Sequence, residues 1–376
     1  MKILENYDLK KLNTFGVSCV ADFFVELNSE NDLQEFFISP IFQDPNIPKL
    51  FLGGGSNILF TKNFEGLVIL NKLKGIEIIK EDLDFVWIKA QSGELWHDLV
   101  TFSVDRGYWG LENLSLIPGS VGAAPVQNIG AYGVELKDVL ESVEVFEIKN
   151  NRNTVTKRIF LNQECEFSYR DSIFKKIKSQ LKPTENKYFI LNIILKLNKK
   201  ENKNLNYKVL QDYINKNNYG LNATKPQLNA TKNFIKSSKD ISLVVSAIRK
   251  SKLPDPAIIG NAGSFFKNVI LPQKGENLPP KLESLLKIYP QIPYFKESTS
   301  LTPQIVKIKI PAAWLIEKAG WKGYRKGNVG VHKDHALVLV NYGGATGAEI
   351  KNLSDQIIKS VFEKFDITLE PEVNIL

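Results

Sequence analysis

Cysteine and histidine are scarce in this chain of 376 residues: there are two cysteines, Cys19 and Cys165, and three histidines, His97, His332 and His335. These are too few for a cysteine zinc site, and a disulfide is not expected in a reducing compartment. No segment approaches the roughly 20 apolar residues of a membrane span. The start carries acids and no apolar run, so we expect no signal peptide and a cytoplasmic protein without a membrane partner.

Several motifs with known chemistry are also missing. No Gly-x-Gly-x-x-Gly opens a helix, since position 58 is isoleucine where a third glycine would stand. No Gly-x-x-x-x-Gly-Lys-Ser/Thr stretch exists, and no Gly-x-Ser-x-Gly surrounds Ser56, Ser120 or Ser264. These absences exclude a Rossmann dinucleotide fold, a P-loop nucleotidase and the serine-hydrolase elbow.

The net charge of +8 and the pI near 9.1 leave nucleic acid, a membrane surface and anionic small molecules open as partners. The lysines are spread along the chain. Where they concentrate, at 175–178 and 199–204, the latter run is mixed with asparagine. We interpret such runs as solvated loops, which leaves a pocket for phosphorylated ligands compatible with the charge.

Three glycine-rich stretches are present instead, at residues 53–57, 117–125 and 260–268. Apolar segments that must be buried flank each of them. Glycine allows positive φ and lets another group approach backbone N–H donors, which a phosphate or oxyanion site requires. We also expect a short helix to begin at Ser120, with free N–H groups directed at an anion.

The hydrophobic pattern predicts an α+β protein rather than a regular βαβ alternation, with a domain boundary near residue 200. The strands are expected at 21–27, 49–52, 67–70, 143–148, 189–197, 336–340 and 368–373. The helices are expected at 31–38, 94–105, 241–250, 311–318 and 346–365, the last opened by the capping box Thr-Gly-Ala-Glu.

Three polar positions invite a functional interpretation, and each has a plain structural alternative. Ser264 is either a reactive hydroxyl or a serine that bonds backbone groups in a tight loop. Arg170 either holds a carboxylate or phosphate as a fork, or forms a surface pair with Asp171 or Asp22. Glu370 and Glu372 share one face of a strand, so one is functional or cation-paired, or both are solvated.

Taken in order, six motifs resemble the UDP-N-acetylenolpyruvoylglucosamine reductase (MurB) family, in its longer (type I) subclass with an extra tyrosine-bearing loop. They are Gly-Gly-Gly-Ser-Asn at 53–57, Ile-Pro-Gly-Ser-Val-Gly-Ala-Ala-Pro-Val-Gln-Asn-Ile-Gly-Ala-Tyr-Gly-Val-Glu at 117–135, Tyr-Arg-Asp-Ser-Ile-Phe-Lys at 169–175, Lys-Leu-Pro-Asp-Pro at 252–256, Gly-Asn-Ala-Gly-Ser-Phe-Phe-Lys-Asn at 260–268 and Glu-Pro-Glu-Val at 370–373.

The resemblance implies an FAD-binding fold of the vanillyl-alcohol-oxidase (PCMH) type. Two small α+β subdomains, about 1–70 and 71–199, would bind non-covalent FAD, and a separate α+β domain at 200–365 would bind substrate. Residues 366–376 would return to the flavin domain as a C-terminal strand. The implied cofactor-binding residues are Gly53, Gly54, Gly55, Ser56, Asn57, Ile117, Pro118, Gly119, Ser120, Gly122, Ala123, Ala124, Gln127, Asn128, Gly130 and Tyr132.

The resemblance also implies the reaction: NADPH reduces FAD, and a hydride then passes from flavin N5 to UDP-N-acetylglucosamine enolpyruvyl ether, giving UDP-N-acetylmuramate for peptidoglycan synthesis. By motif position, Arg170 and Glu372 stabilise the enolate and Ser264 supplies the proton. The implied substrate-binding residues are Tyr169, Tyr207, Lys252 and Asn268. No metal takes part, and every ligand is a polyanion, which suits the basic charge.

Two alternatives stay open beside this resemblance. One is another FAD-dependent oxidase or dehydrogenase of the same fold with a different substrate. The other is a basic nucleic-acid-binding or scaffold protein, which would carry no yellow chromophore. We expect a monomer without a nucleic-acid partner.

Overall fold

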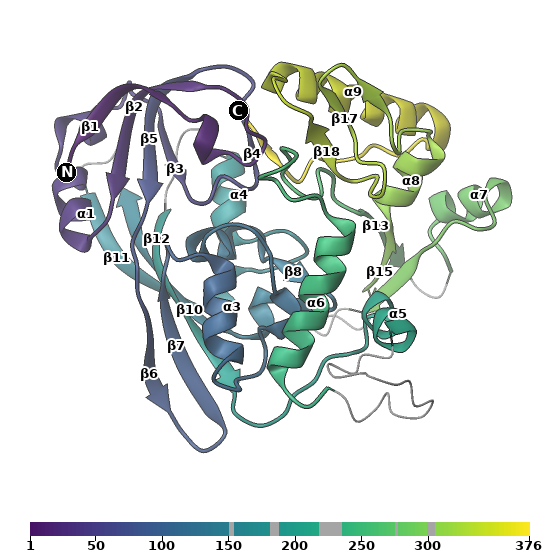
Figure 1. Cartoon of the computed structure of the whole chain (residues 1–376), viewed down its shortest axis with the longest axis horizontal. Helices are drawn as coiled ribbons and strands as arrows, with labels where there is room; N and C mark the ends of the chain where they lie inside the picture. The colour runs from purple at the N-terminus through teal and green to yellow at the C-terminus, as the bar shows by residue number, and fades with distance from the viewer. Residues whose placement is uncertain (150–153, 181–187, 218–234, 275–276, 299–304) are drawn as a thin grey trace. The chain divides into compact units, whose positions relative to one another are not determined.

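The computed structural model describes the whole chain except residues 150–153, 181–187, 218–234, 275–276 and 299–304 (Figure 1). It forms two compact units. Unit 1 holds residues 1–8, 20–55 and 63–251, and unit 2 holds residues 9–19, 56–62 and 252–376. The units are divided differently from the domains expected at 1–199, 200–365 and 366–376. The division into flavin-binding and substrate-binding domains stays a prediction, because the two compact units do not show which residues bind FAD or substrate.

The first sheet of unit 1 has the order β1-β2-β5-β3 and is formed by β1 (Ile3–Asp8), β2 (Val20–Leu27), β5 (Phe64–Asn71) and β3 (Lys49–Leu52). β1 runs antiparallel to β2, while β2 and β3 run parallel to β5. Helices α1 (Glu30–Phe37) and α2 (Pro40–Gln43) contribute Phe36, Phe37 and Phe42 to the core over this sheet. The expected strands at 21–27, 49–52 and 67–70 are confirmed.

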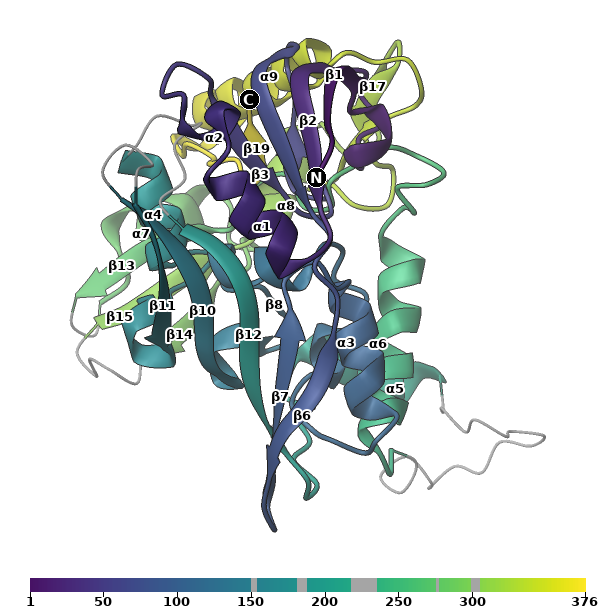
Figure 2. The same ribbon diagram turned by 90° about the vertical axis from the view of Figure 1, so that its left-hand side faces the viewer.

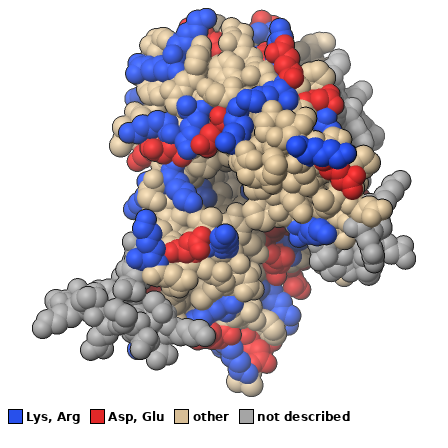
Figure 3. Space-filling view, turned by 90° about the vertical axis from the view of Figure 1, so that its right-hand side faces the viewer, with Lys and Arg blue, Asp and Glu red and all other residues tan. Residues whose placement is uncertain are grey.

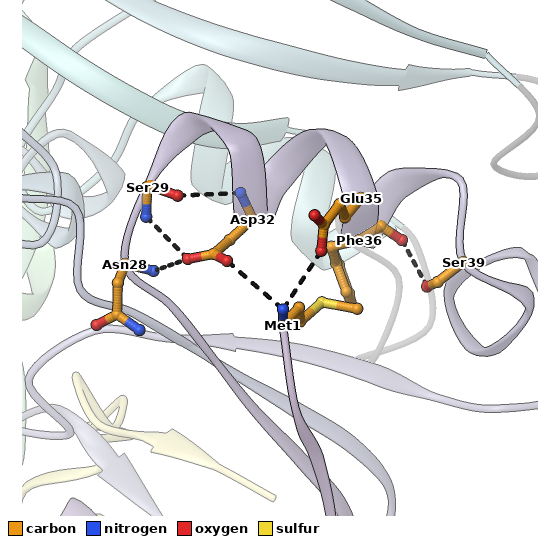
Figure 4. Close-up of polar contacts among 7 residues, drawn as sticks. All are labelled: Met1, Asn28, Ser29, Asp32, Glu35, Phe36 and Ser39. Carbon is orange, nitrogen blue, oxygen red and sulfur yellow. Dashed lines mark hydrogen bonds and ion pairs between the residues drawn. The ribbon is translucent and has the colours of Figure 1, made fainter.

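Helix α1 begins where its sequence provides a cap. Ser29 Oγ accepts a hydrogen bond from the Asp32 N–H at 3.1 Å, and the Asp32 carboxylate accepts from Asn28 and Ser29, as Figure 4 shows. The Asn28 N–H is the main cause that holds the pKa of Asp32 below its usual value. The amino group of Met1 lies 3.3 Å from Glu35 and 3.8 Å from Asp32, which fixes the start of β1 against this helix.

The second sheet of unit 1 is antiparallel, with the order β11-β10-β12-β7-β6, and Figure 2 shows its strands side by side. Its strands are β11 (Thr154–Leu161), β10 (Leu140–Lys149), β12 (Tyr188–Asn198), β7 (Phe85–Gln91) and β6 (Ile76–Glu81). Helix α3 (Trp96–Val104) packs Trp96, Leu99 and Val100 into the same core as Ile88 and Ile193. The expected helix at 94–105 and strands at 143–148 and 189–197 are confirmed.

The described part of unit 1 also contains the helices α4 (Ile173–Gln180), α5 (Lys208–Asn217) and α6 (Ser238–Lys252), and the last residue of α6 belongs to unit 2. α6 and α5 share an apolar cluster, in which Ile241, Val245 and Ile248 of α6 lie with Leu210 of α5 and with Trp109. The expected amphipathic helix at 241–250 is confirmed. Its apolar face packs against Trp109, in the segment that follows α3.

Among its described residues, unit 2 has two small antiparallel sheets. One has the order β13-β15-β14, from β13 (Val269–Lys274), β15 (Ile305–Ile310) and β14 (Phe295–Ser298), and the other joins β16 (Arg325–Lys326), β17 (Val329–Val331) and β18 (Leu339–Asn341). Its helices are α7 (Pro280–Ile288), α8 (Ala312–Lys318) and α9 (Gly347–Phe365). α9 begins at the expected capping box of Thr346 and Glu349. The helices expected at 311–318 and 346–365 are confirmed.

Two expected strands of unit 2 are displaced. Ala336 and Leu337 form a turn, so β18 begins only at Leu339. The strand expected at 368–373 is reduced to one bridge at Pro371, because proline has no N–H for a sheet ladder. The chain ends instead in β19 (Asn374–Ile375), which pairs in parallel with β4 (Ile58–Leu59).

Both cysteines are buried, and neither forms a disulfide. Burial raises the pKa of Cys165 to about 12, and its Sγ lies 3.4 Å from the Leu161 carbonyl. At pH 8 the thiolate fraction of Cys165 is therefore on the order of 10⁻⁴. We expect a disulfide-exchange reagent such as DTNB to titrate two thiols only after denaturation. Rapid labelling of Cys165 in the native protein would contradict this burial.

Candidate functional site

The first two glycine stretches lie against each other inside unit 1. A Cβ added to Gly53 would stand 2.4 Å from the Oγ of Ser120, and one added to Gly54 would stand 2.9 Å from the Cα of Gly119. Real Cβ atoms do not approach backbone so closely, so only glycine permits this packing at position 54. The two stretches thus form one backbone-lined cradle, which we call the glycine cradle: residues 53–55 and 119–122.

The prediction of a helix that begins at Ser120 with free N–H groups is wrong. Only short 3-10 turns are present, at Val121–Ala123 and Pro125–Gln127. The N–H of Val121 donates to the Glu94 carbonyl at 2.8 Å, and that of Gly122 donates to the Ser92 carbonyl at 2.8 Å. These donors hold the stretch to the chain before α3. In the described part of unit 1, no acceptor takes the N–H groups of Gly54 and Gly55, so they are available to a ligand.

Two left-handed residues follow the second stretch, within the motif at 117–135. Asn128 has φ +44° and Tyr132 has φ +50°. The side-chain amide of Asn128 donates to Glu135 at 3.0 Å and its Oδ1 accepts from the Lys137 N–H at 3.1 Å. Asn128 is fully buried, so its side chain holds the turn, and any ligand contact would come from its backbone.

Arg170 lies beside this stretch in unit 1. Its backbone is left-handed, with φ +55°, in a turn where Ser168 and Asp171 exchange two backbone hydrogen bonds. The Arg170 Nη2 donates to the Gly130 carbonyl at 2.9 Å, and its guanidinium lies 5.5 Å from the ring centre of Tyr169. This hydrogen bond joins the motif at 169–175 to Gly130 of the motif at 117–135.

Tyr207 also lies in this part of unit 1. Its ring meets the Tyr132 ring edge to face at 5.6 Å between centroids, and Tyr207 is 44 % exposed. Asn113 Nδ2 donates to the carbonyls of both Tyr132 and Asn204, each at 2.9 Å, which joins the loop before α5 to the motif at 117–135. Burial raises the pKa of Tyr132. The structure brings together Tyr132, Arg170 and Tyr207, three of the residues expected from the sequence.

Arg249 of α6 is a residue of this region that the sequence did not single out. Burial lowers its pKa, and the charge of Arg170 lowers it further. Its Nε donates to the Leu116 carbonyl at 3.2 Å. Arg249 is half-buried, and no carboxylate in the described chain forms an ion pair with it. In the sequence, Arg249 stands three residues before the motif that starts at Lys252, and this position could have marked it as a candidate site residue.

Unit 2 holds the third glycine stretch and pairs the segment that contains Ser264 with the segment that contains Glu372. Phe266 pairs with Pro371 in an antiparallel bridge, and the Glu372 N–H donates to the Phe265 carbonyl at 2.7 Å. Ser264 is thus one register position from the residue opposite Glu372. On its other side Ser264 pairs with Val338. Gly260 packs so tightly that a Cβ would stand 2.2 Å from the Phe15 carbonyl oxygen.

The hydrogen bonds around Ser264 bear on the two interpretations of its hydroxyl. Among the described residues, its Oγ makes no hydrogen bond to backbone or to a histidine, so it does not stabilise the loop. His335, in the same unit, is already engaged, because its Nδ1 accepts from the Leu337 N–H at 3.3 Å. Burial, then the charge of Lys252, lowers the pKa of His335 to about 4. A serine-histidine nucleophile is therefore not assembled.

The other site residues expected in unit 2 make different kinds of contact. Lys267 pairs with Glu370 at 3.0 Å, so Glu370 is a surface ion-pair partner. Asn57 Nδ2 donates to the Glu372 carbonyl at 3.2 Å, which joins the first glycine motif to the C-terminal segment. Asn268 Oδ1 accepts from the Ala312 N–H at 3.1 Å at the start of α8. Lys252 lies near His335, as its charge effect shows.

Charge on the described surface is mixed. Figure 3 shows Lys and Arg interspersed with Asp and Glu on the face that it draws. Many lysines are paired, for example Lys199 with Glu81 at 2.6 Å and Lys351 with Asp355 at 2.6 Å. In the described part of the chain, no helix is long and apolar enough to cross a membrane.

Comparison with known proteins gives consistent matches. A family model for the C-terminal domain of UDP-N-acetylenolpyruvoylglucosamine reductase matches residues 255–376, and one for an FAD-binding domain matches residues 21–150. The chain is 45% identical to the UDP-N-acetylenolpyruvoylglucosamine reductase of Flavobacterium johnsoniae over 100% of both chains. It is 39% identical to the Pseudomonas aeruginosa protein of that name, over 100% of this chain and 99% of the other.

A solved structure shares the fold. The crystal structure of the same-named reductase (MurB) from Thermus caldophilus matches with a TM-score of 0.57 at 23% identity, over 100% of this chain and 98% of that chain. The expected α+β fold of the FAD-binding type is thereby confirmed.

Proposed function

Since the chain belongs to the UDP-N-acetylenolpyruvoylglucosamine reductase family, we propose that it reduces UDP-N-acetylglucosamine enolpyruvyl ether to UDP-N-acetylmuramate with electrons from NADPH. The chain is an FAD-dependent oxidoreductase. We further propose that it acts in the cytoplasm, as a monomer, in peptidoglycan precursor synthesis.

The glycine cradle fits FAD. Its backbone approaches are too close for any side chain at Gly54, and the N–H groups of Gly54 and Gly55 have no acceptor in the described part of unit 1. Such donors suit a pyrophosphate, which carries negative charge and many acceptors. Residues 53–57 and 117–132 would hold the cofactor. When bound, FAD supplies the redox chemistry, as a hydride acceptor toward NADPH and a hydride donor toward the enolpyruvyl group.

The protein's own part in the reaction is to control charge and a proton. Hydride addition to the terminal vinyl carbon leaves negative charge that spreads from the neighbouring carbon into the substrate carboxylate. Arg170 would hold that carboxylate with charged hydrogen bonds, and Glu372 would assist if it carries or shares a proton. Ser264 Oγ would then give its proton to the neighbouring carbon and recover one from solvent. The balance is one hydride and one proton added across the double bond.

The observation that carries this assignment is the pairing of the Ser264 segment with the Glu372 segment, together with a Ser264 hydroxyl that makes no hydrogen bond in the described chain. Tyr207, Lys252 and Asn268 would bind the nucleotide diphosphate, substrate and NADPH, with Tyr169 beside Arg170. An alternative is another FAD-dependent oxidase or dehydrogenase of the same fold.

A simple assay separates these possibilities. The purified protein should be yellow with a flavin absorption spectrum, and it should oxidise NADPH in proportion to added enolpyruvyl sugar nucleotide. A colourless protein that binds no FAD would contradict a flavoenzyme of any substrate. A yellow protein that oxidises NADPH at the same rate with and without this substrate would favour the alternative.

Arg170→Lys tests the proposed fork. Lysine keeps the charge but cannot make two parallel hydrogen bonds to a carboxylate. We expect kcat/KM for the enolpyruvyl substrate to fall about 10- to 100-fold, the range for a lost charge-assisted hydrogen bond. FAD content and the rate of FAD reduction by NADPH should change little. Arg106→Lys, at an exposed arginine after α3, is the control and should match the wild type.

A further inference from the structure

Leu116 is a strained residue at the entrance to the second glycine stretch. Its φ is +55°, in the left-handed region that leucine rarely adopts. Such a backbone persists only when its surroundings fix it. The residues that follow directly, 117–122, run into the glycine cradle, so whatever fixes Leu116 also sets where that stretch begins.

Two titratable side chains form hydrogen bonds with the backbone of Leu116, one with its N–H and one with its carbonyl. Its N–H donates to His97 Nδ1 at 3.1 Å, and its carbonyl accepts from Arg249 Nε at 3.2 Å. His97 belongs to α3 and Arg249 to α6, which lie side by side in Figure 1 and Figure 2. A buried hydrogen bond between Ser115 and Ser242, at 2.8 Å, joins the same segment to α6.

The first turn of α3 holds the stretch at further points. Trp96 donates from its indole Nε1 to the Leu114 carbonyl at 2.9 Å and from its backbone N–H to the Gly119 carbonyl at 3.0 Å. The His97 contact lies between these two along the chain. His97 is therefore one of a row of contacts that fix residues 114–119, and it is the contact whose chemistry changes with pH.

Histidine Nδ1 accepts a hydrogen bond only while it carries no proton. The charged groups that face His97 are Asp98 on its own helix and Lys250 and Arg249 on α6. Burial lowers the pKa of His97 most, the two cations lower it further, and Asp98 opposes them. The folded protein thus favours the neutral imidazole that the Leu116 N–H requires. Protonation would replace this acceptor with a second donor facing an N–H.

We propose that His97 is a positioning residue for the second glycine stretch, and that its protonation weakens FAD binding by releasing the Leu116 backbone. The inference rests on the FAD binding of the proposed function. Its sign follows from linkage. Because the proton is disfavoured in the folded state, the stabilising contact is fully present above the ordinary histidine pKa and is lost as pH falls through the lowered one.

The experiment is FAD affinity as a function of pH, measured from quenching of flavin fluorescence on titration of the apoprotein between pH 5 and 8. For the wild type we expect constant affinity down to the lowered pKa of His97, which lies below about 6.5, and from there a decrease of at most about tenfold per pH unit, the limit for one proton. His97→Gln offers an amide oxygen that accepts the Leu116 N–H at every pH. We expect its affinity at pH 8 to be near wild type and its pH dependence to be lost.

Two further variants complete the test. His97→Ala removes the acceptor, so its FAD affinity should be about five- to tenfold weaker at pH 8, the usual effect of one hydrogen bond. His332→Gln makes the same change as His97→Gln in unit 2 and should keep the wild-type profile. Thermal melting of each apoprotein checks folding.

A His97→Gln protein that keeps the wild-type pH dependence, or a folded His97→Ala protein with unchanged affinity at pH 8, would overturn the inference while leaving the proposed function intact. A wild-type protein that binds no FAD at any pH would overturn both.

Discussion

Ser264→Ala is expected to leave FAD reduction by NADPH unchanged and to slow reduction of the enolpyruvyl group about 10²- to 10⁴-fold, the usual worth of a positioned proton donor. In the proposed mechanism the Ser264 hydroxyl acts only after the hydride has reached the enolpyruvyl group, so it takes no part in the reduction of FAD. Its Oγ makes no hydrogen bond in the described chain, so alanine removes no structural contact. Stopped-flow absorbance at the flavin band measures each half-reaction separately.

Two further variants make the Ser264 result specific. Ser264→Cys keeps a proton-bearing group of similar size and should recover part of the lost rate. Ser284→Ala removes an exposed serine hydroxyl of unit 2, which bonds the Pro280 carbonyl at 3.0 Å, and should behave as wild type. If Ser264→Ala slows both half-reactions equally, the proton-donor role is wrong and the serine instead shapes the site.

Gly54→Ala is expected to weaken FAD binding roughly tenfold or more. The new Cβ would stand 2.9 Å from the Cα of Gly119, and backbone cannot rotate away as a side chain can. The two glycine stretches would have to separate, with an overpacking cost of about 1–3 kcal/mol. That cost acts on the cradle itself, so we expect FAD affinity to fall roughly tenfold or more. The ratio of flavin to protein absorbance after gel filtration measures it.

Gly107→Ala is the matched control for this change. Gly107 follows α3 with φ +76°, and nothing lies within 4 Å of its added Cβ. Alanine there strains the backbone by about 1–2 kcal/mol without touching the cradle. Its melting temperature should fall while its FAD content stays full. If Gly54→Ala keeps full FAD content, the glycine cradle does not bind the cofactor.

The regular elements of unit 1 were predictable because their signals are local. The strand at Val20–Leu27 and the helix at Glu30–Phe37 follow from alternation, periodicity and the Ser29 cap. In unit 2 an available signal was missed. The segment Ile305–Ile310 alternates apolar residues with lysine, which is typical of a strand, and it forms the centre of the β13-β15-β14 sheet.

Features that depend on tertiary contacts were not predictable. From the sequence we expected the backbone N–H groups after Ser120 to lack acceptors within the protein. In the structure, the Val121 N–H donates to the Glu94 carbonyl and the Gly122 N–H donates to the Ser92 carbonyl. Arg249 and His97, which both hydrogen-bond the Leu116 backbone, likewise acquire their roles only through the packing of α3 and α6. The candidates that were found in advance, such as Ser264 and Arg170, came from ordered motifs rather than from local chemistry.

The central claim is that one flavoenzyme takes electrons from NADPH and gives them to an enolpyruvyl sugar nucleotide. An anaerobic titration followed at the flavin absorption band tests it most directly. We predict that NADPH bleaches the bound FAD and that UDP-N-acetylglucosamine enolpyruvyl ether then restores the oxidised spectrum, with one UDP-N-acetylmuramate formed per flavin. Bleached flavin that stays reduced after this substrate is added would contradict the account.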